Sequence, residues 1–145
     1  MGPNLNTRVR NDANSRRRPE RRGVVAVEFA ITAPIFFLFL LASFEFGWLN
    51  VMRHTADNAA YEAARAVVVP GATAAEATAK ATSILNVVGA RGAKISITPA
   101  NITASTTEVT VAVDLPMSSN GLITPRFTGK TTLHSQSTLK TERAE

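Results

Sequence analysis

The feature that most constrains this chain is an apolar run from Val24 to Leu49. As an α-helix, its 26 residues span about 39 Å, which exceeds a hydrocarbon core of about 30 Å. No charged residue lies between Phe29 and Phe44, and apolar side chains occur all around the helix, which argues against an amphipathic surface helix. No other segment is apolar enough to surround this helix in a soluble core. The run therefore predicts a single transmembrane helix over residues 24–49.

The net charge of the chain is concentrated in its first 23 residues. Met1 to Gly23 holds seven Arg against Asp12 and Glu20, a net charge of +5 that equals the formal charge of the whole chain. A basic arm on a neutral body is typical of an anchoring or targeting signal, so no nucleic-acid partner is expected. Because the arginines flank the N-terminal side of the apolar run, we expect residues 1–23 in the cytoplasm and residues 50–145 outside it. The first 22 residues are expected to be disordered in water.

Helical signals continue beyond the apolar run. The long helix is expected to reach about Val69, where a Pro-Gly pair ends it. Thr73 followed by Glu76 is a capping-box pattern. It predicts the start of a second, alanine-rich helix that runs to about Val88.

The period then changes from helix to strand. Isoleucines alternate with polar residues at 94–98, and four apolar residues alternate with smaller or polar ones at 107–115. Both patterns are typical of half-buried strands. A loop at 116–130 and a weaker third strand at 131–140 complete the pattern. We therefore expect an α+β fold, in which a long transmembrane helix continues into a small domain with a second helix and a roughly three-stranded antiparallel sheet.

One acidic residue lies inside the apolar run. Glu28 follows Gly23 by five residues, and a carboxylate in lipid costs about 2.5–3.5 kcal/mol, so it needs a compensating partner. Cleavage after Gly23 would give Val24 a free α-amine with a pKa of about 8, largely cationic at neutral pH. Glu28 of one copy can then pair with Val24 of the next copy. Such a pair fixes the axial register between subunits more than it adds stability.

This arrangement resembles the signal sequences of type IV pilins, in which cleavage follows a glycine and a glutamate occupies mature position 5. The wider pattern is similar to the TadE-like pseudopilins of the tight-adherence (Flp pilus) system, at residues 23–34 (GVVAVEFAITAP), 44–47 (FEFG) and 58–65 (NAAYEAAR). The sequence departs from the family where Tyr61 replaces the usual Arg and Ala63 the usual Gly. Beyond Pro70 the resemblance is only to a short, β-rich C-terminal part.

The resemblance implies that a membrane-bound prepilin peptidase cuts between Gly23 and Val24. Gly23 would be read by the peptidase, while Glu28 and Val24 would serve in assembly. Pro34 removes one helix hydrogen bond and is expected to kink the helix. The remaining positions of the family motif are Phe29, Glu45 and Gly47.

The function implied is that of a minor pilin or pseudopilin in the assembly of tight-adherence pili or a related secretion machine. Its partners would be the prepilin peptidase, other pilins or pseudopilins, the assembly platform of the inner membrane, and the lipid bilayer. The chain would lie in the bacterial inner membrane, with a surface filament as a second location. No catalytic activity, cofactor or metal is expected.

Other interpretations stay open. The chain can be a static single-pass membrane protein whose exported domain binds a partner or the cell wall. An exported enzyme is less favoured because no reactive constellation appears, and a secretory signal cut near Phe44 lacks a good cleavage pattern. At single residues, Glu28 can face another helix, Glu45 is favoured as a solvated carboxylate, and Asp114, His54 and His134 are interpreted as surface residues. The absence of cysteine excludes disulfides and thiolate metal sites.

Overall fold

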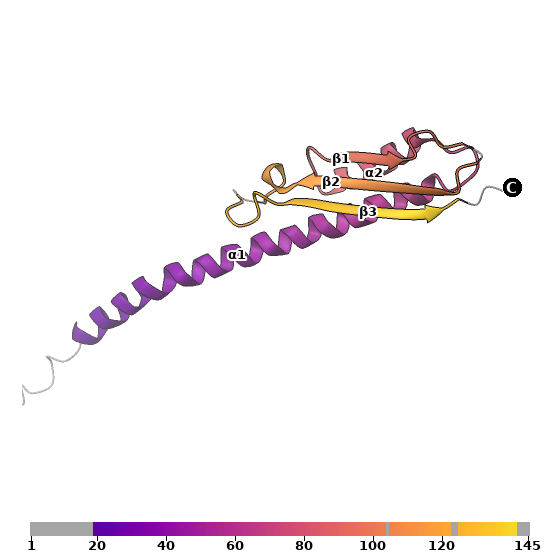
Figure 1. Cartoon of the computed structure of the whole chain (residues 1–145). Coiled ribbons are helices and arrows are strands. Elements are labelled where there is room, and N and C mark those ends of the chain that lie inside the picture. The colour runs from indigo at the N-terminus through magenta and orange to yellow at the C-terminus, as the bar shows by residue number, and fades with distance from the viewer. Residues whose placement is uncertain (1–18, 104, 123–124, 142–145) are drawn as a thin grey trace, which may run out of the picture. The chain divides into compact units, whose positions relative to one another are not determined.

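The structure is a computed structural model and describes residues 19–103, 105–122 and 125–141. Residues 1–18, most of the predicted leader, lie outside this described part. The elements in chain order (Figure 1) are α1 (Pro19–Ala66), α2 (Ala74–Val87), β1 (Lys94–Thr98), β2 (Glu108–Pro116), the 3-10 turn η1 (Met117–Ser119) and β3 (Thr132–Lys140). The predicted α+β class is confirmed. The chain divides into two compact units, residues 1–40 and residues 41–145.

The first unit contains the N-terminal part of α1. The helix begins at Pro19, so the expectation of disorder up to residue 22 is wrong for its last four residues. Proline suits the first position of a helix because its φ is preset and its missing N–H would lack a partner there. The helix continues through Pro34, where the ring removes one backbone hydrogen bond.

The second unit contains a three-stranded antiparallel sheet in the order β1-β2-β3 (Figure 1). β1 has the predicted bounds of 94–98, and the other two strands begin one residue later than predicted. Ile97 pairs with Val111, and Leu115 pairs with Leu133. This register places the apolar residues of all three strands on one face.

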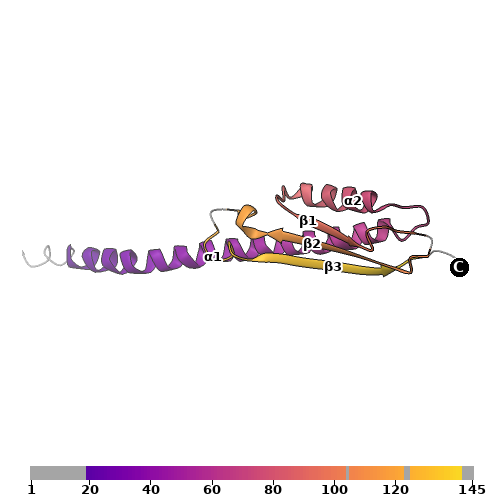
Figure 2. The same ribbon diagram turned by 45° about the horizontal axis from the view of Figure 1, so that its top comes forward.

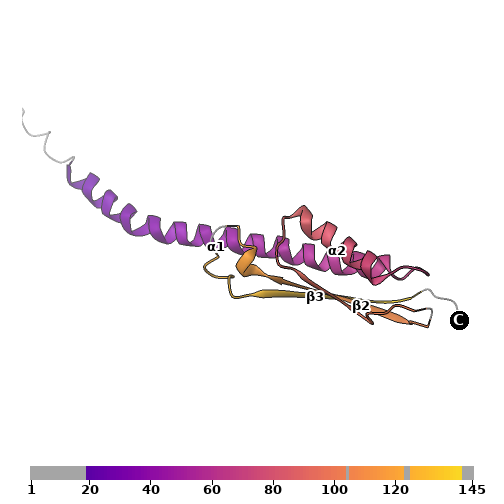
Figure 3. The ribbon, with the colours of Figure 1, turned by 90° about the horizontal axis from the view of Figure 1, so that it is seen from above.

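The core lies between this face and the helices. Figures 2 and 3 show α2 and the C-terminal part of α1 on the same side of the sheet. Alanines predominate on the helix side, so the backbones approach the sheet closely. The buried residues of this cluster are Ala56, Ala59, Ala60, Ala63, Ala64, Val67, Ala77, Ala81, Leu85, Val109, Val111 and Val113.

The turns around α2 follow the sequence signals. α1 ends at Ala66, three residues short of the prediction, because the next N–H groups bond to carbonyls three residues back and Pro70 disfavours helical backbone at the residue before it. Thr73 caps α2, with Thr73 and Glu76 forming the predicted capping box. Gly89 follows α2 with φ +67, a conformation that favours glycine.

A second cluster joins α1 to the end of the sheet where β2 leads into η1. It consists of Met52, Leu115, Met117 and Leu133, with Trp48 and Leu49 packed against it. The connection from β2 to β3 therefore lies beside the residues with which α1 enters the second unit. This position makes the connection part of the candidate site.

Candidate functional site

The predicted processing segment is helical. Gly23 lies in the second turn of α1, and Val24 follows it within the same helix. An added Cβ at Gly23 meets no atom within 4 Å, so packing does not demand glycine there. Val24 is 68% exposed. Both residues are exposed, while the peptide bond between them lies within the helix.

Glu28 lies one turn beyond Val24 on the same side of α1. Four residues rise about 6 Å along a helix, so positions 24 and 28 are surface neighbours. The Glu28 side chain is exposed, and no residue in the described part of the chain forms a salt bridge with its carboxylate. Its backbone carbonyl accepts a hydrogen bond from Thr32 Oγ1 at 2.9 Å.

The surface around Glu28 is apolar. Within the described part, α1 is the one helix long and apolar enough to cross a membrane, a finding that suggests membrane anchoring. Phe29, a family-motif position, is 69% exposed. The other large apolar residues exposed before Glu45 are Val24, Val25, Val27, Ile31, Ile35, Phe36, Phe37, Leu38, Phe39, Leu40, Leu41 and Phe44.

Glu45 is held by the loop before β3, within the second unit. Its Oε1 accepts hydrogen bonds from the backbone N–H of Phe127 (2.9 Å) and of Thr128 (2.6 Å) and from Thr128 Oγ1 (2.8 Å). Its Oε2 accepts one from the backbone N–H of Arg126 at 3.3 Å. The interpretation of Glu45 as a solvated carboxylate is therefore wrong. The family motif marks this position, but its partners lie more than 80 residues further along the chain.

Sequence reasoning placed Asn120 in the loop at 116–130 and did not predict its contacts. The residue is buried, with 5% of its surface exposed. Its Nδ2 donates to the carbonyls of Arg91 and Pro116, each at 2.7 Å, and its Oδ1 accepts from Arg91 N–H at 2.6 Å. Trp48 Nε1 donates to the Asn120 carbonyl at 2.6 Å. This network ties α1 to η1 and to the segment before β1.

Two neighbours of Glu45 differ in their packing. Phe46 stacks on Phe127, with ring centroids 6.4 Å apart and planes at 28°. An added Cβ at Gly47 meets nothing within 4 Å. Gly47 is thus not required by contacts within the second unit.

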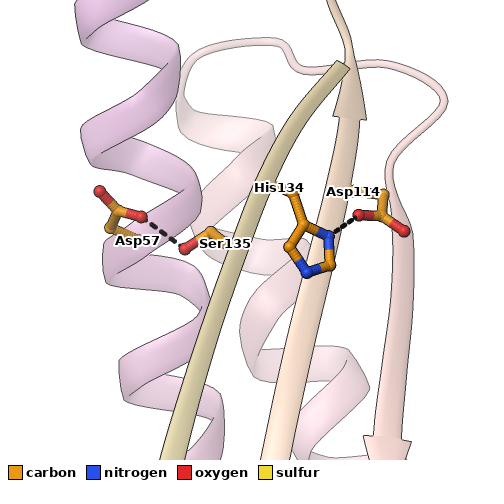
Figure 4. Close-up of polar contacts among 4 residues, drawn as sticks. All are labelled: Asp57, Asp114, His134 and Ser135. Atoms are coloured by element: carbon orange, nitrogen blue, oxygen red, sulfur yellow. Dashed lines mark hydrogen bonds and ion pairs between the residues drawn. The ribbon is translucent and has the colours of Figure 1, made fainter.

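A second set of polar residues lies along β3. Ser135 Oγ donates to Asp57 of α1 at 2.5 Å, and His134 contacts Asp114 of β2 (Figure 4). The side chains of His134 and Asp114 are 62% and 41% exposed, which agrees with their interpretation as surface residues. Because consecutive strand residues point to opposite faces, Ser135 and His134 do not form a nucleophile–base pair. No group of His, Asp and Glu within the described ranges is arranged to hold a metal ion.

Residues 23–65 match the family described as TadE-like protein, which covers the predicted processing segment, Glu28, Pro34 and Glu45. This agrees with the resemblance found in the sequence. No curated protein and no solved structure matches the chain.

Proposed function

Because residues 23–65 are TadE-like and thereby associate the chain with the tight-adherence pilus system, we propose that it is a minor pilin or pseudopilin. It takes part in assembling tight-adherence pili or a related secretion machine. Its role is assembly rather than catalysis, and it uses no cofactor.

Processing occurs between Gly23 and Val24, by a prepilin peptidase. Glycine within a helix lowers its stability by about 0.5–1 kcal/mol relative to alanine. Gly23 lies in the second turn of α1, where helix ends fray most easily. Local opening there would expose the bond to the peptidase without disturbing the sheet domain. The mature chain begins at Val24.

Glu28 sets the register of assembly. The observation that carries this proposal is an exposed carboxylate on an apolar, exposed helix, with no partner in the described part of its own chain. In lipid or between packed helices, such a charge is unfavourable by about 2.5–3.5 kcal/mol. The α-amine of Val24 in a neighbouring pilin would compensate it, and the apolar surface around both residues would pack against the same neighbour.

The chain lies in the inner membrane, with its N-terminus in the cytoplasm and residues 50–145 outside it. The arginine-rich leader supports this orientation. There it meets its partners, which are the prepilin peptidase, other pilins or pseudopilins and the assembly platform. The bilayer surrounds the apolar part of α1 until the subunit is assembled, when it can enter a surface filament.

The test is co-purification of the tagged full chain with the other pilins from its host. Glu28→Ala should be processed normally but recovered without the other pilins, and Glu28→Gln should show most of the same loss because it removes the charge. Glu62→Ala is the matched control, since Glu62 is an acid on the same helix that pairs with Arg65 at the surface. If the Glu28→Ala variant recovers the other pilins as well as the natural chain does, a static membrane anchor is favoured instead.

A further inference from the structure

We propose that the second unit rests on the outer surface of the membrane through a patch formed by Phe46, Leu122, Arg126, Phe127 and Lys130. We call this patch the collar. Its occupant is the lipid surface, with apolar side chains in the interfacial layer and the two cations against lipid phosphates. The inference rests on the part of the proposed function in which α1 spans the membrane.

The depth of Glu45 relative to the membrane follows from the length of the apolar helix before it. The 21 residues from Val24 to Phe44 span about 31 Å as a helix, which matches a hydrocarbon core of about 30 Å. The hydrocarbon can therefore end at Phe44. Glu45, the next residue, then lies at the level of the lipid headgroups, and residues 45–49 leave the hydrocarbon.

Glu45 brings the loop before β3 to this level. The backbone N–H groups of Arg126, Phe127 and Thr128 all donate to its carboxylate, at 2.6–3.3 Å. Phe127 also stacks on Phe46. The loop therefore lies at the headgroup level together with Glu45, whichever way the rest of the unit faces.

The apolar collar residues are exposed. Phe46 and Phe127 are each 50% exposed and Leu122 is 56% exposed. Aromatic residues are favoured at the membrane–water interface. Trp48 is half-buried, with its N–H bonded to the carbonyl of Asn120. The exposed rings at this level are those of Phe46 and Phe127.

The collar also carries positive charge. The connection from Pro116 to Thr131 contains Arg126 and Lys130 and no acidic residue, and both cations are exposed. Glu45 is the carboxylate that faces the loop, and its oxygens accept bonds from the loop itself. The collar therefore combines apolar side chains with positive charge, which complements an anionic lipid surface.

The test uses single cysteines, because the natural chain has none. Full-length protein is reconstituted into vesicles of phosphatidylglycerol and phosphatidylcholine with a spin label at Leu38→Cys, Phe127→Cys or Asn101→Cys. Position 38 lies in the predicted span, and position 101 lies in the turn at the opposite end of the sheet. Accessibility to oxygen and to a water-soluble nickel chelate is measured for each label.

If the collar docks on lipid, the ratio of oxygen to nickel accessibility at position 127 should lie between the ratios at positions 38 and 101. If the label at 38 is in lipid but that at 127 is as open to nickel as that at 101, the inference is overturned while the span stands. If the label at 38 is itself aqueous, the span fails and the inference fails with it. A label at 127 that is shielded from both reagents would indicate a protein partner and would also contradict lipid docking.

A second arm tests the charge. Arg126→Gln combined with Lys130→Gln keeps the backbone bond from residue 126 to Glu45. In the natural collar sequence, a label at Leu122→Cys should be more exposed to lipid in vesicles that contain phosphatidylglycerol than in vesicles of phosphatidylcholine alone. In the double variant, this difference in lipid exposure should disappear. Arg65→Gln, an exposed cation far along α1, is the control and should leave that difference unchanged. An unchanged difference in the double variant would contradict the role of the two cations.

Discussion

At the residue scale, Glu45 shows how one carboxylate can join segments far apart in the sequence. Three of its four hydrogen bonds converge on Oε1, and the fourth reaches Oε2. A carboxylate is suited to this role because it only accepts, with several lone pairs on two oxygens. The loop before β3 depends on these bonds for its position.

Amide hydrogen exchange can test the role of Glu45 residue by residue. In Glu45→Ala, the amides of Phe127 and Thr128 should lose their protection, and so should that of Arg126. In Glu45→Gln, the remaining oxygen can still accept from residues 127 and 128, whereas the new NH₂ group cannot accept from residue 126. Amides of β2 serve as the internal control. Unchanged exchange at residues 126–128 in Glu45→Ala would contradict the contact.

Loss of the Asn120 side chain is expected to destabilise the fold more than loss of the Glu45 carboxylate, because Asn120 is buried. Asn120→Ala leaves the N–H and carbonyl of Arg91 and the carbonyl of Pro116 without their partner, so we expect a loss of about 2–3 kcal/mol in the free energy of unfolding. Urea denaturation of the full chain in detergent measures it. Asn101→Ala, at an exposed site, should change stability by less than about 0.5 kcal/mol. A loss that small for Asn120→Ala would show that the network is not needed.

At the element scale, local patterns predicted most of the second unit. Alternation from Val109 to Leu115 identified the buried face of β2, and the capping box of Thr73 and Glu76 placed the start of α2. These signals depend only on near neighbours, so one sequence is enough to find them. The partners of Glu45 and Asn120 depend on how distant segments meet, and no local periodicity encodes that. The sequence therefore indicated the candidate residues that lie on α1. It did not indicate the contacts that the loop before β3 and Asn120 make.

The alanine-rich face of α1 determines how closely the helix approaches the sheet. Ala60 is fully buried against it, so Ala60→Leu should overpack the core and lower the free energy of unfolding by about 1–3 kcal/mol. The matched control is Ala79→Leu on the exposed face of α2, which should be nearly neutral. Chemical denaturation of both variants checks the prediction. Equal stability of the two would mean that the helix can move away from the sheet.

At the scale of the whole molecule, charge and apolar surface are separated along the chain. The net positive charge lies in the first 23 residues, and an exposed apolar helix follows it. The C-terminal unit has its own alanine and valine core. This separation fits a subunit that is held in a membrane by one part and presents the other outside.

The proposed pilin function depends first on processing after Gly23. The most direct measurement is N-terminal sequencing of the protein extracted from the membranes of its host, beside a Gly23→Ala variant. If the chain is processed as a pilin, the natural chain should start at Val24, and this start should be lost in the variant. An intact start at Met1 in the natural chain would exclude pilin processing and leave a static membrane anchor.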